Sequence, residues 1–285
     1  MRASDLYEKL EKDFDLDSCK DVDIKCWSGM EFNQYVPELF RKRYMGLYID
    51  NSTEINTVYT AVFPSDEVLK HILATGVTDT LLLVHHPMIW DIRLPDAFTY
   101  IDNELVDQMN KKKISIYVLH APLDKNGQYS TSVNFAKAIG VRQESEFCKY
   151  FGVVNVGIIG STDYKTVNDL VKHIKSVVAH DVRLWNYGTK DIKNGIVALA
   201  AGGGNEKFIL EEVLNLGINT YITGVTVKND FSKKAHDFAE KNKINLIGAT
   251  HYSTEKFACI VMCSYFEELG LSCEFIEDLP LIEDI

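Results

Sequence analysis

The sequence predicts an α/β protein with layered mixed sheets flanked by helices, and with two similar-sized α/β parts in one subunit. Apolar strand-like runs alternate with amphipathic helix-like segments along the chain. The run LLLV at residues 81–84 is continuously apolar, which is typical of a strand covered on both faces. The alternation restarts near residues 150–160, although no Pro-rich or Gly/Ser-rich linker precedes it. We therefore expect one part from residues 1–125 plus 245–285 and a second from residues 126–244.

The first half of the chain carries clear helix signals. Leu6, Leu10 and Phe14 recur every four residues and predict an amphipathic helix over residues 4–14. A second helix is expected over residues 64–76, because Ser65 is a good N-cap and a glycine closes the segment. Periodicity and β-branched or aromatic runs predict the remaining elements, which are strands at 44–50, 55–63, 79–87 and 114–120 and helices at 103–113 and 132–140.

The second half continues the same alternation. Thr166 and Asp169 have the spacing of a capping pair at the start of a helix over residues 166–179. The other predicted elements are strands at 181–188, 195–204, 219–224, 244–250 and 272–278 and helices at 206–217, 233–243 and 254–270.

Charge and composition exclude several classes of protein. The 285 residues carry 30 Lys and Arg against 41 Asp and Glu, a net charge of −11, whereas a nucleic-acid or anionic-membrane binder needs a basic face. No apolar run is long enough to cross a bilayer, and the start lacks the apolar region of a signal peptide. The six cysteines form no CxxC pair, and Cys259 and Cys263 are expected on a buried helix face. We therefore expect a cytoplasmic protein.

Polar side chains follow three of the predicted strands, at the points where each strand ends. His85 and His86 follow LLLV, and His120 follows ISIYVL with an aspartate four residues later in HAPLD. His251 and Glu255, in HYSTE, follow a third strand and are spaced for one helix face. Open α/β sheets bind ligands at the carboxyl ends of their strands, so these groups are candidates for one site.

This mixture of neutral imidazole and carboxylate is the ligand set of zinc, manganese, iron, cobalt or nickel sites. With Asp124 included there are more than four candidate ligands, which suggests two ions. Adjacent histidines at a strand end can then serve different ions. Each signal also has a structural interpretation: a strand-end histidine often bonds a loop, Asp is common in turns, and an acid suits a helix start.

Other motifs allow more than one interpretation. The segment AAGGGNEKF joins a strand to a helix, which suits either an anion-binding nest or a tight turn, and it lacks the GxGxxG and Walker spacings. A nucleotide-binding module using GGGNE would bind its ligand without metal. No GxSxG motif or recognisable catalytic cysteine indicates a nucleophile.

The ordered set LLLVHHP, HAPLD with SVNFAKAIG, AAGGGNEKFI, YITG and HYSTE resembles the Nif-three-like dinuclear metal-centre family, whose members are often named type-two GTP cyclohydrolases. The resemblance runs from about Gly46 to the C-terminus. It implies a two-part α/β subunit assembled into a homohexamer and a small-molecule substrate. It also implies a ligand set for two divalent metal ions: His85, His86, Asp124, His251 and Glu255.

The resemblance also places His120 beside the centre, and it matches His236 to a histidine that follows the TG loop of the family. Three positions depart from the pattern: Val225 replaces an acidic residue, Thr250 replaces a glycine, and HAPLD replaces HTNLD.

Two functions fit these observations. The first is a metal-dependent hydrolase of a small substrate such as the nucleotide GTP, with His120 or His236 transferring protons because imidazole titrates near neutrality. The second is a non-catalytic metal-binding assembly or regulatory protein, whose ions would have no open coordination position.

Overall fold

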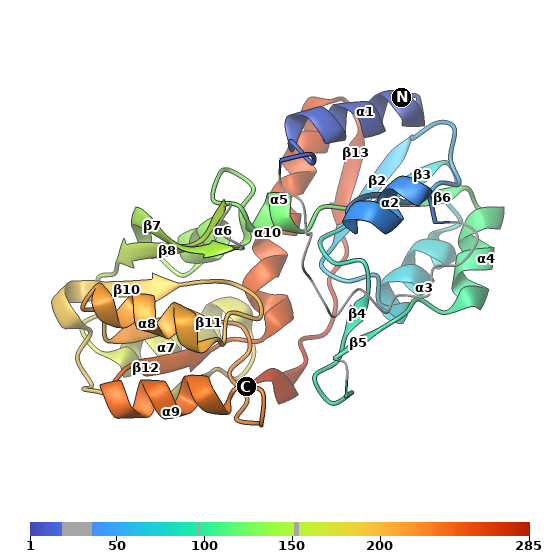
Figure 1. The fold of residues 1–285 in the computed structure, drawn as a ribbon. Helices are drawn as coiled ribbons and strands as arrows, with labels where there is room; N and C mark the ends of the chain where they lie inside the picture. The colour runs from blue at the N-terminus through green and yellow to red at the C-terminus, as the bar shows by residue number, and fades with distance from the viewer. Residues whose placement is uncertain (19–35, 96, 151–153) are drawn as a thin grey trace. The chain divides into compact units, whose positions relative to one another are not determined.

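The computed structural model describes residues 1–18, 36–95, 97–150 and 154–285 (Figure 1). These residues form two compact units of similar size. Unit 1 comprises Met1–Leu123 and Cys259–Asp278, and unit 2 comprises Asp124–Ala258 and Leu279–Ile285. Each unit has its own sheet and its own helices, which confirms the predicted α/β class with two parts.

Unit 1 contains a five-stranded sheet. Its central strands are parallel, whereas the first strand of the chain runs antiparallel at one edge. The strands, in spatial order, are β1 (Gly46–Ile49), β6 (Ile114–Val118), β3 (Thr80–Val84), β2 (Thr57–Ala61) and β13 (Ser272–Phe275). All five residues of β3 are buried, as the apolar run predicts for a strand covered on both faces.

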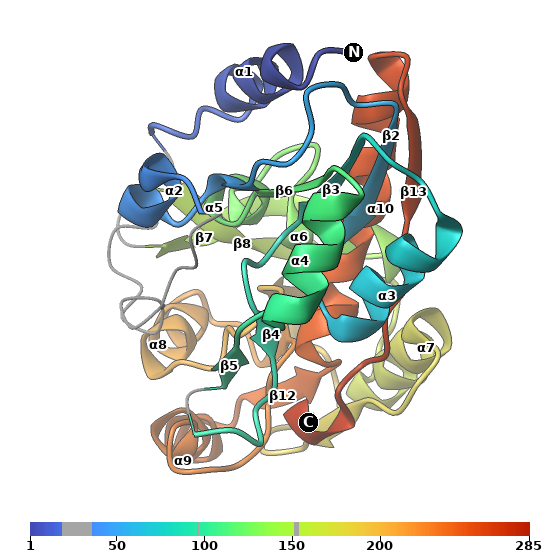
Figure 2. The same cartoon turned by 90° about the vertical axis from the view of Figure 1, so that its right-hand side faces the viewer.

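Helices cover both faces of this sheet, and the alternation of side chains along the strands decides which residues meet them. Leu82 and Ile116 face the apolar core made with α3 (Asp66–Thr75) and α4 (Asn103–Lys111) (Figure 2). On the other face the Tyr117 hydroxyl donates to Glu11 of α1 (Ala3–Asp13), and the Thr60 hydroxyl donates to the Cys259 carbonyl of α10 (His251–Glu268). The sheet is therefore buried between two helical layers.

The ends of α3 show the expected capping. The Ser65 hydroxyl accepts a hydrogen bond from the Val68 N–H at 3.2 Å, which satisfies one of the free amides at the helix start. Gly76 adopts a left-handed conformation with φ of +75°, and its N–H bonds the Leu73 carbonyl. Both ends of this helix are confirmed.

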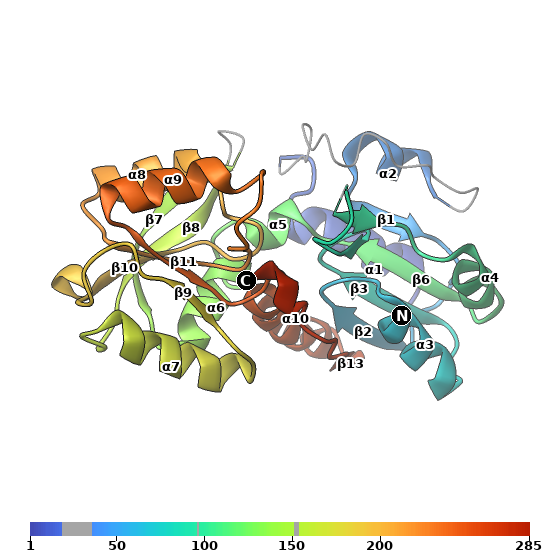
Figure 3. The same cartoon turned by 90° about the horizontal axis from the view of Figure 1, so that it is seen from below.

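Unit 2 contains a six-stranded mixed sheet. Its strands, in spatial order, are β7 (Arg142–Tyr150), β8 (Val154–Ser161), β10 (Ile196–Leu199), β11 (Thr220–Thr223), β12 (Asn245–Gly248) and β9 (Arg183–Trp185). One face packs against α6 (Thr131–Ala138) and α7 (Val167–Val178), and the other packs against α8 (Lys207–Asn215) and α9 (Lys233–Asn242) (Figure 3). The Thr166 hydroxyl caps α7 by accepting from the Asp169 N–H, as the spacing predicts.

Several short elements lack a periodic signal and were not predicted. They are α2 (Glu38–Arg43), the hairpin β4 (Ile89–Trp90) with β5 (Phe98–Thr99), α5 (Ala121–Asp124), and the 3₁₀ turns η2 (Lys193–Gly195) and η3 (Ile282–Asp284). Strand β7 was also missed, because its sequence RQESEFCKY is mostly polar. The last long helix begins at His251, three residues earlier than predicted, so His251 and Glu255 share one helix.

Among the described ranges, none of the helices has the length and apolarity that a membrane crossing requires. The compact units divide the chain at residues 123/124, 258/259 and 278/279. The division of the chain into two domains, residues 1–125 plus 245–285 and residues 126–244, stays a prediction. The strand β12 at residues 245–248 pairs within the sheet of unit 2.

Replacing Leu82 by alanine tests whether the sheet of unit 1 depends on its central strand. Leu82 is fully buried in the core under α3 and α4, so we expect Leu82→Ala to lower the free energy of unfolding by about 2–5 kcal/mol. Urea denaturation followed by circular dichroism measures this change. The exposed Leu94 provides the control, and equal losses for Leu82→Ala and Leu94→Ala would contradict the account.

Candidate metal centre

Parallel pairing in unit 1 brings three histidines to one edge of the sheet. Strands β3 and β6 are neighbours with Val84 opposite Val118, so the residues after them leave the sheet side by side. The His85 N–H donates to the Ala61 carbonyl at 3.2 Å, which extends the pairing with β2 and fixes the main chain at the start of the His-His pair. The strand pairing of the protein itself therefore fixes the main-chain positions of these histidines.

We call His85, His86 and His120 the imidazole cluster. The ring centroids are 4.4 Å apart for His85 and His86, 4.9 Å for His85 and His120, and 4.8 Å for His86 and His120. Each ring offers a nitrogen within 4.8 Å of the nitrogens of the other two. All three side chains are buried, the most exposed being His120 at 8%. The cluster thus gathers three nitrogen donors away from bulk solvent.

One hydrogen bond fixes the state of His85. Its Nδ1 lies 2.9 Å from the Leu119 carbonyl oxygen, which can only accept, so the neutral ring carries its proton on Nδ1. The Nε2 of the same ring is then the unprotonated nitrogen, which carries the in-plane lone pair. Metal-binding histidines commonly have this arrangement, because a carbonyl behind the ring orients it and raises its basicity. The Phe63 ring stacks on His86 at 4.7 Å and holds that ring in place.

A second candidate group lies in unit 2, at the start of α10. His251 and Glu255 are one helical turn apart and buried, and the His251 Nε2 lies 3.1 Å from the Glu255 carboxylate. The His251 N–H donates to the buried Asp284 carboxylate at 2.9 Å, so the C-terminal segment anchors the helix start. Thr250, just before the helix, has a φ of +66°, a conformation in which glycine is unstrained and a β-branched residue is rare. This geometry explains why a glycine suits position 250.

The glycine segment after β10 packs directly on this pair. Gly202 has a φ of +75°, and a side chain there would collide with the Glu255 carboxylate and approach the His251 Nε2 to 3.4 Å. The Gly202 N–H donates to the Thr254 hydroxyl at 2.9 Å, and the Gly202 carbonyl accepts from Val225. At least one glycine of AAGGGNEKF therefore serves close packing against the carboxylate.

The remaining predicted site residues also lie in unit 2. Asp124 ends the short helix α5, and its carboxylate accepts a hydrogen bond from the Thr131 hydroxyl at 3.2 Å. His236 is buried on α9, where its Nδ1 lies 2.9 Å from the Tyr187 hydroxyl and its Nε2 lies 3.1 Å from the Thr226 carbonyl. Burial lowers the pKa of His236. Both ring nitrogens of His236 are thus engaged within the protein.

The structure brings the sequence-predicted residues together in two groups. Unit 1 holds the imidazole cluster, and unit 2 holds the His251–Glu255 pair. Assembly of the five predicted ligands in one dinuclear centre stays a prediction. Sequence reasoning missed the supporting partners Leu119 and Asp284. The first acts through its main-chain carbonyl and the second lies far away in the chain, so neither leaves a local motif.

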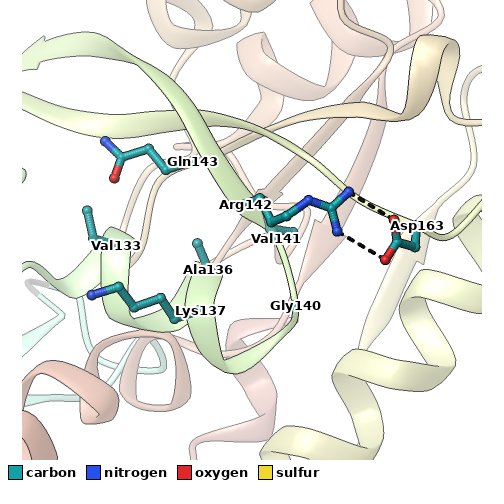
Figure 4. A pocket seen from close by; sticks show the side chains of 8 residues that line it. All are labelled: Val133, Ala136, Lys137, Gly140, Val141, Arg142, Gln143 and Asp163. Carbon is teal, nitrogen blue, oxygen red and sulfur yellow. Dashed lines mark hydrogen bonds and ion pairs between the residues drawn. The ribbon is translucent and has the colours of Figure 1, made fainter.

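A separate pocket of about 460 Å³ opens in unit 2 beside α6 and β7 (Figure 4). Two of its three charged residues, Arg142 and Asp163, form a two-pronged ion pair at 2.9 and 3.0 Å, and the third is Lys137. The pocket contains neither a histidine nor a cysteine and has no candidate metal ligand beyond that paired carboxylate.

Comparison with known proteins identifies relatives of this chain. The family model Duf34/NIF3 (NGG1p interacting factor 3) matches residues 37–279. A Borreliella burgdorferi protein named "GTP cyclohydrolase 1 type 2 homolog" is 29% identical over 259 residues, which cover 90% of this chain and 96% of that protein. A Pyrococcus horikoshii protein of the same name is 27% identical over 240 residues, which cover 82% of this chain and 88% of that protein.

Solved structures share the fold. The protein ybgI, of unknown function, has a TM-score of 0.75 at 17% identity and is covered in full, with 99% of this chain matched. The Staphylococcus aureus hypothetical protein SA1388 has a TM-score of 0.70 at 18% identity, with 98% of this chain and 97% of that chain matched. The family model covers most of the sequence, and this chain therefore belongs to the Duf34/NIF3 family.

Proposed function

We propose that this protein binds two divalent metal ions and uses them to hydrolyse a small substrate, with the nucleotide GTP as the first candidate. The proposed ligands are His85, His86, Asp124, His251 and Glu255. The observation that carries this proposal is the imidazole cluster, in which three buried rings converge at the ends of two parallel strands. The nitrogens of these rings lie within 4.8 Å of one another, and imidazole is a common ligand of divalent transition metals.

The chemistry of the donor atoms fits such ions. Imidazole nitrogen together with carboxylate oxygen suits zinc, manganese, iron, cobalt or nickel, whereas magnesium and calcium prefer sites made of oxygen alone. The proton on the Nδ1 of His85 supports this assignment, because it leaves Nε2 as the donor atom. The close fit of Gly202 against Glu255 supports a fixed position for that carboxylate.

The course of the chain supports combining both groups in one centre. The chain passes from unit 1 to unit 2 between Leu123 and Asp124, just after His120. It passes back within α10, three residues after Glu255. Three of the five proposed ligands, Asp124, His251 and Glu255, thus lie near a crossing in the sequence. The resemblance of the ordered motifs to the family points to the same set of five.

Divalent ions at these ligands would polarise the scissile group of a substrate and lower the pKa of bound water. Of the two predicted proton-transfer residues, we assign the role to His120, whose ring lies against both histidines of the β3 end. We propose that His236 instead positions the segment before α9, because it binds Tyr187 and Thr226 through both nitrogens. GTP as substrate rests on the names of the relatives, and a homohexamer rests on the family resemblance. The cytoplasmic location stays a prediction.

Metal analysis of purified protein tests the ligand set. We expect two divalent ions per chain in the native protein and fewer than one when His85 and His251 are both replaced by alanine, because the change removes a donor from each group. Inductively coupled plasma mass spectrometry measures the content. His71→Ala, at an exposed histidine of α3, should leave it unchanged. Two ions per chain in the double variant would exclude this ligand set.

A methyl group added at Gly202 tests the positioning of Glu255. Because a Cβ at position 202 would displace the carboxylate, we expect Gly202→Ala to weaken metal binding by about 10–100-fold, as changes beside metal ligands typically do. Gly76→Ala is the matched control, since Gly76 has the same φ of +75° with open space around it. Competition with a chromophoric chelator measures the affinity. Equal affinities for the two variants would contradict the proposed role of Glu255.

Turnover assays separate the hydrolase from a metal-binding protein without catalysis. We expect metal-loaded protein to hydrolyse GTP, chelation to abolish the activity, and Glu255→Gln to reduce kcat/KM at least 10–100-fold. Product formation is followed by chromatography, and Lys256→Gln, at the next position of α10, serves as the control. A Glu255→Gln variant with full activity would exclude the catalytic assignment. Full metal content without turnover of GTP would favour a non-catalytic metal-binding protein.

A further inference from the structure

Two cysteines that are distant from any sequence motif meet in unit 1. Cys263 lies in α10 and Cys273 lies in β13, the edge strand of the five-stranded sheet. Their sulfur atoms are 3.2 Å apart, and the Thr60 hydroxyl lies 3.4 Å from the Cys263 sulfur. Both cysteines are half-buried. The sequence predicts Cys263 on a buried apolar face with Cys259. Cys259 is buried, whereas Cys263 is half-buried and lies beside the thiol of Cys273.

The contact makes the two thiols unequal. The Cys273 S–H donates to the Cys263 sulfur and lowers the pKa of Cys263 to about 7, against the opposing effect of burial. The same hydrogen bond raises the pKa of Cys273, because the proton that it donates is held more tightly. The thiolate is the reactive form of cysteine, so this hydrogen bond makes Cys263 the more nucleophilic of the two thiols. A resolving thiol lies beside it.

The other described cysteines, Cys148 and Cys259, do not combine a lowered pKa with a neighbouring thiol. Cys148 is buried, and its desolvation raises the pKa to about 12. Cys259 is fully buried and donates its S–H to the Ala61 carbonyl at 3.3 Å. Neither therefore provides a nucleophilic thiolate with a neighbouring thiol.

We propose that Cys263 and Cys273 form a dithiol–disulfide site that reacts with low-molecular-weight disulfides. The Cys263 thiolate attacks one sulfur of the small disulfide, which forms a mixed disulfide and expels a first small thiolate. That thiolate accepts the Cys273 proton, and the Cys273 sulfur then attacks the Cys263 sulfur and expels the second small thiolate. The second thiolate takes up from solvent the proton that Cys263 had released. The net change converts two protein thiols and one small disulfide into a protein disulfide and two small thiols. This site goes beyond the proposed metal-dependent reaction.

Little movement is needed for this bond to form. A disulfide has a sulfur separation of about 2.05 Å, so the two sulfurs must approach by about 1 Å. Closure would tie α10 to β13, which lies beside β2 at the end of the strand order described for this sheet. The product would be a cross-link between a helix and the edge of its sheet.

Peptide mapping tests the site directly. The native protein is incubated with glutathione disulfide at pH 7, alkylated, and digested with trypsin and an endoprotease that cleaves after glutamate. Cleavage after Glu267 or Glu268 separates the peptide of Cys263 from that of Cys273, and no Lys or Arg follows Lys256. The two peptides remain joined only through a disulfide. We expect the joined peptides in native protein and in Cys259→Ala, and their loss in Cys263→Ser.

Three results would overturn the proposal. They are the absence of any disulfide under these conditions, a stable glutathione adduct on Cys263 that Cys273 does not resolve, and joined peptides that disappear in Cys259→Ala. Alkylation by iodoacetamide at pH 7 gives a second measurement. We expect Cys273→Ala to slow alkylation of Cys263 about tenfold, because the donor that stabilises the thiolate is gone. An unchanged rate would also contradict the site. Metal content in Cys263→Ser should equal that of native protein, which separates this inference from the metal proposal.

Discussion

The arrangement of the candidate site depends on the parallel pairing of β3 with β6. Val84 lies opposite Val118, so the segments that follow β3 and β6 leave the sheet at the same level. The residues that come next place three imidazole rings within contact distance. Five consecutive residue pairs, from Thr80 opposite Ile114 to Val84 opposite Val118, define this register, and the apolar layers on both sides bury every residue of β3. The core of unit 1 therefore determines the geometry of the histidines, and the Leu119 carbonyl determines the protonation of one of them.

In unit 2 the site residues depend on unusual main-chain conformations. Thr250 and Gly202 both have positive φ, and they lie on either side of the His251–Glu255 pair. Thr250 turns the chain into α10, whereas Gly202 allows the strand-to-helix loop to approach the carboxylate. A non-glycine residue such as Thr250 persists in this conformation only where the surroundings hold it, and the hydrogen bond from the Ser253 N–H to the Thr250 hydroxyl is part of that support. The geometry of this pair thus has a conformational cost, which is a feature common to functional sites.

Much of the fold could be predicted from the sequence because its signals are local. Ser65 and Gly76 mark the ends of α3 by their own chemistry, and the apolar run of β3 indicates its burial. Elements such as α2 and β7 gave no periodic signal, because one is too short and the other is mostly polar. The meeting of His85, His86 and His120 was predictable from the rule that strand ends converge. The contact between Cys263 and Cys273 was not, because it depends on how α10 packs on an edge strand.

Metal-loaded crystals measured at the absorption edge of the bound metal would test the central claim most directly. The account predicts two anomalous peaks per chain about 3.5–4 Å apart, each within about 2.0–2.2 Å of ligand atoms from the proposed set, with His85 bound through Nε2. A single peak, or peaks bound by residues outside that set, would contradict it.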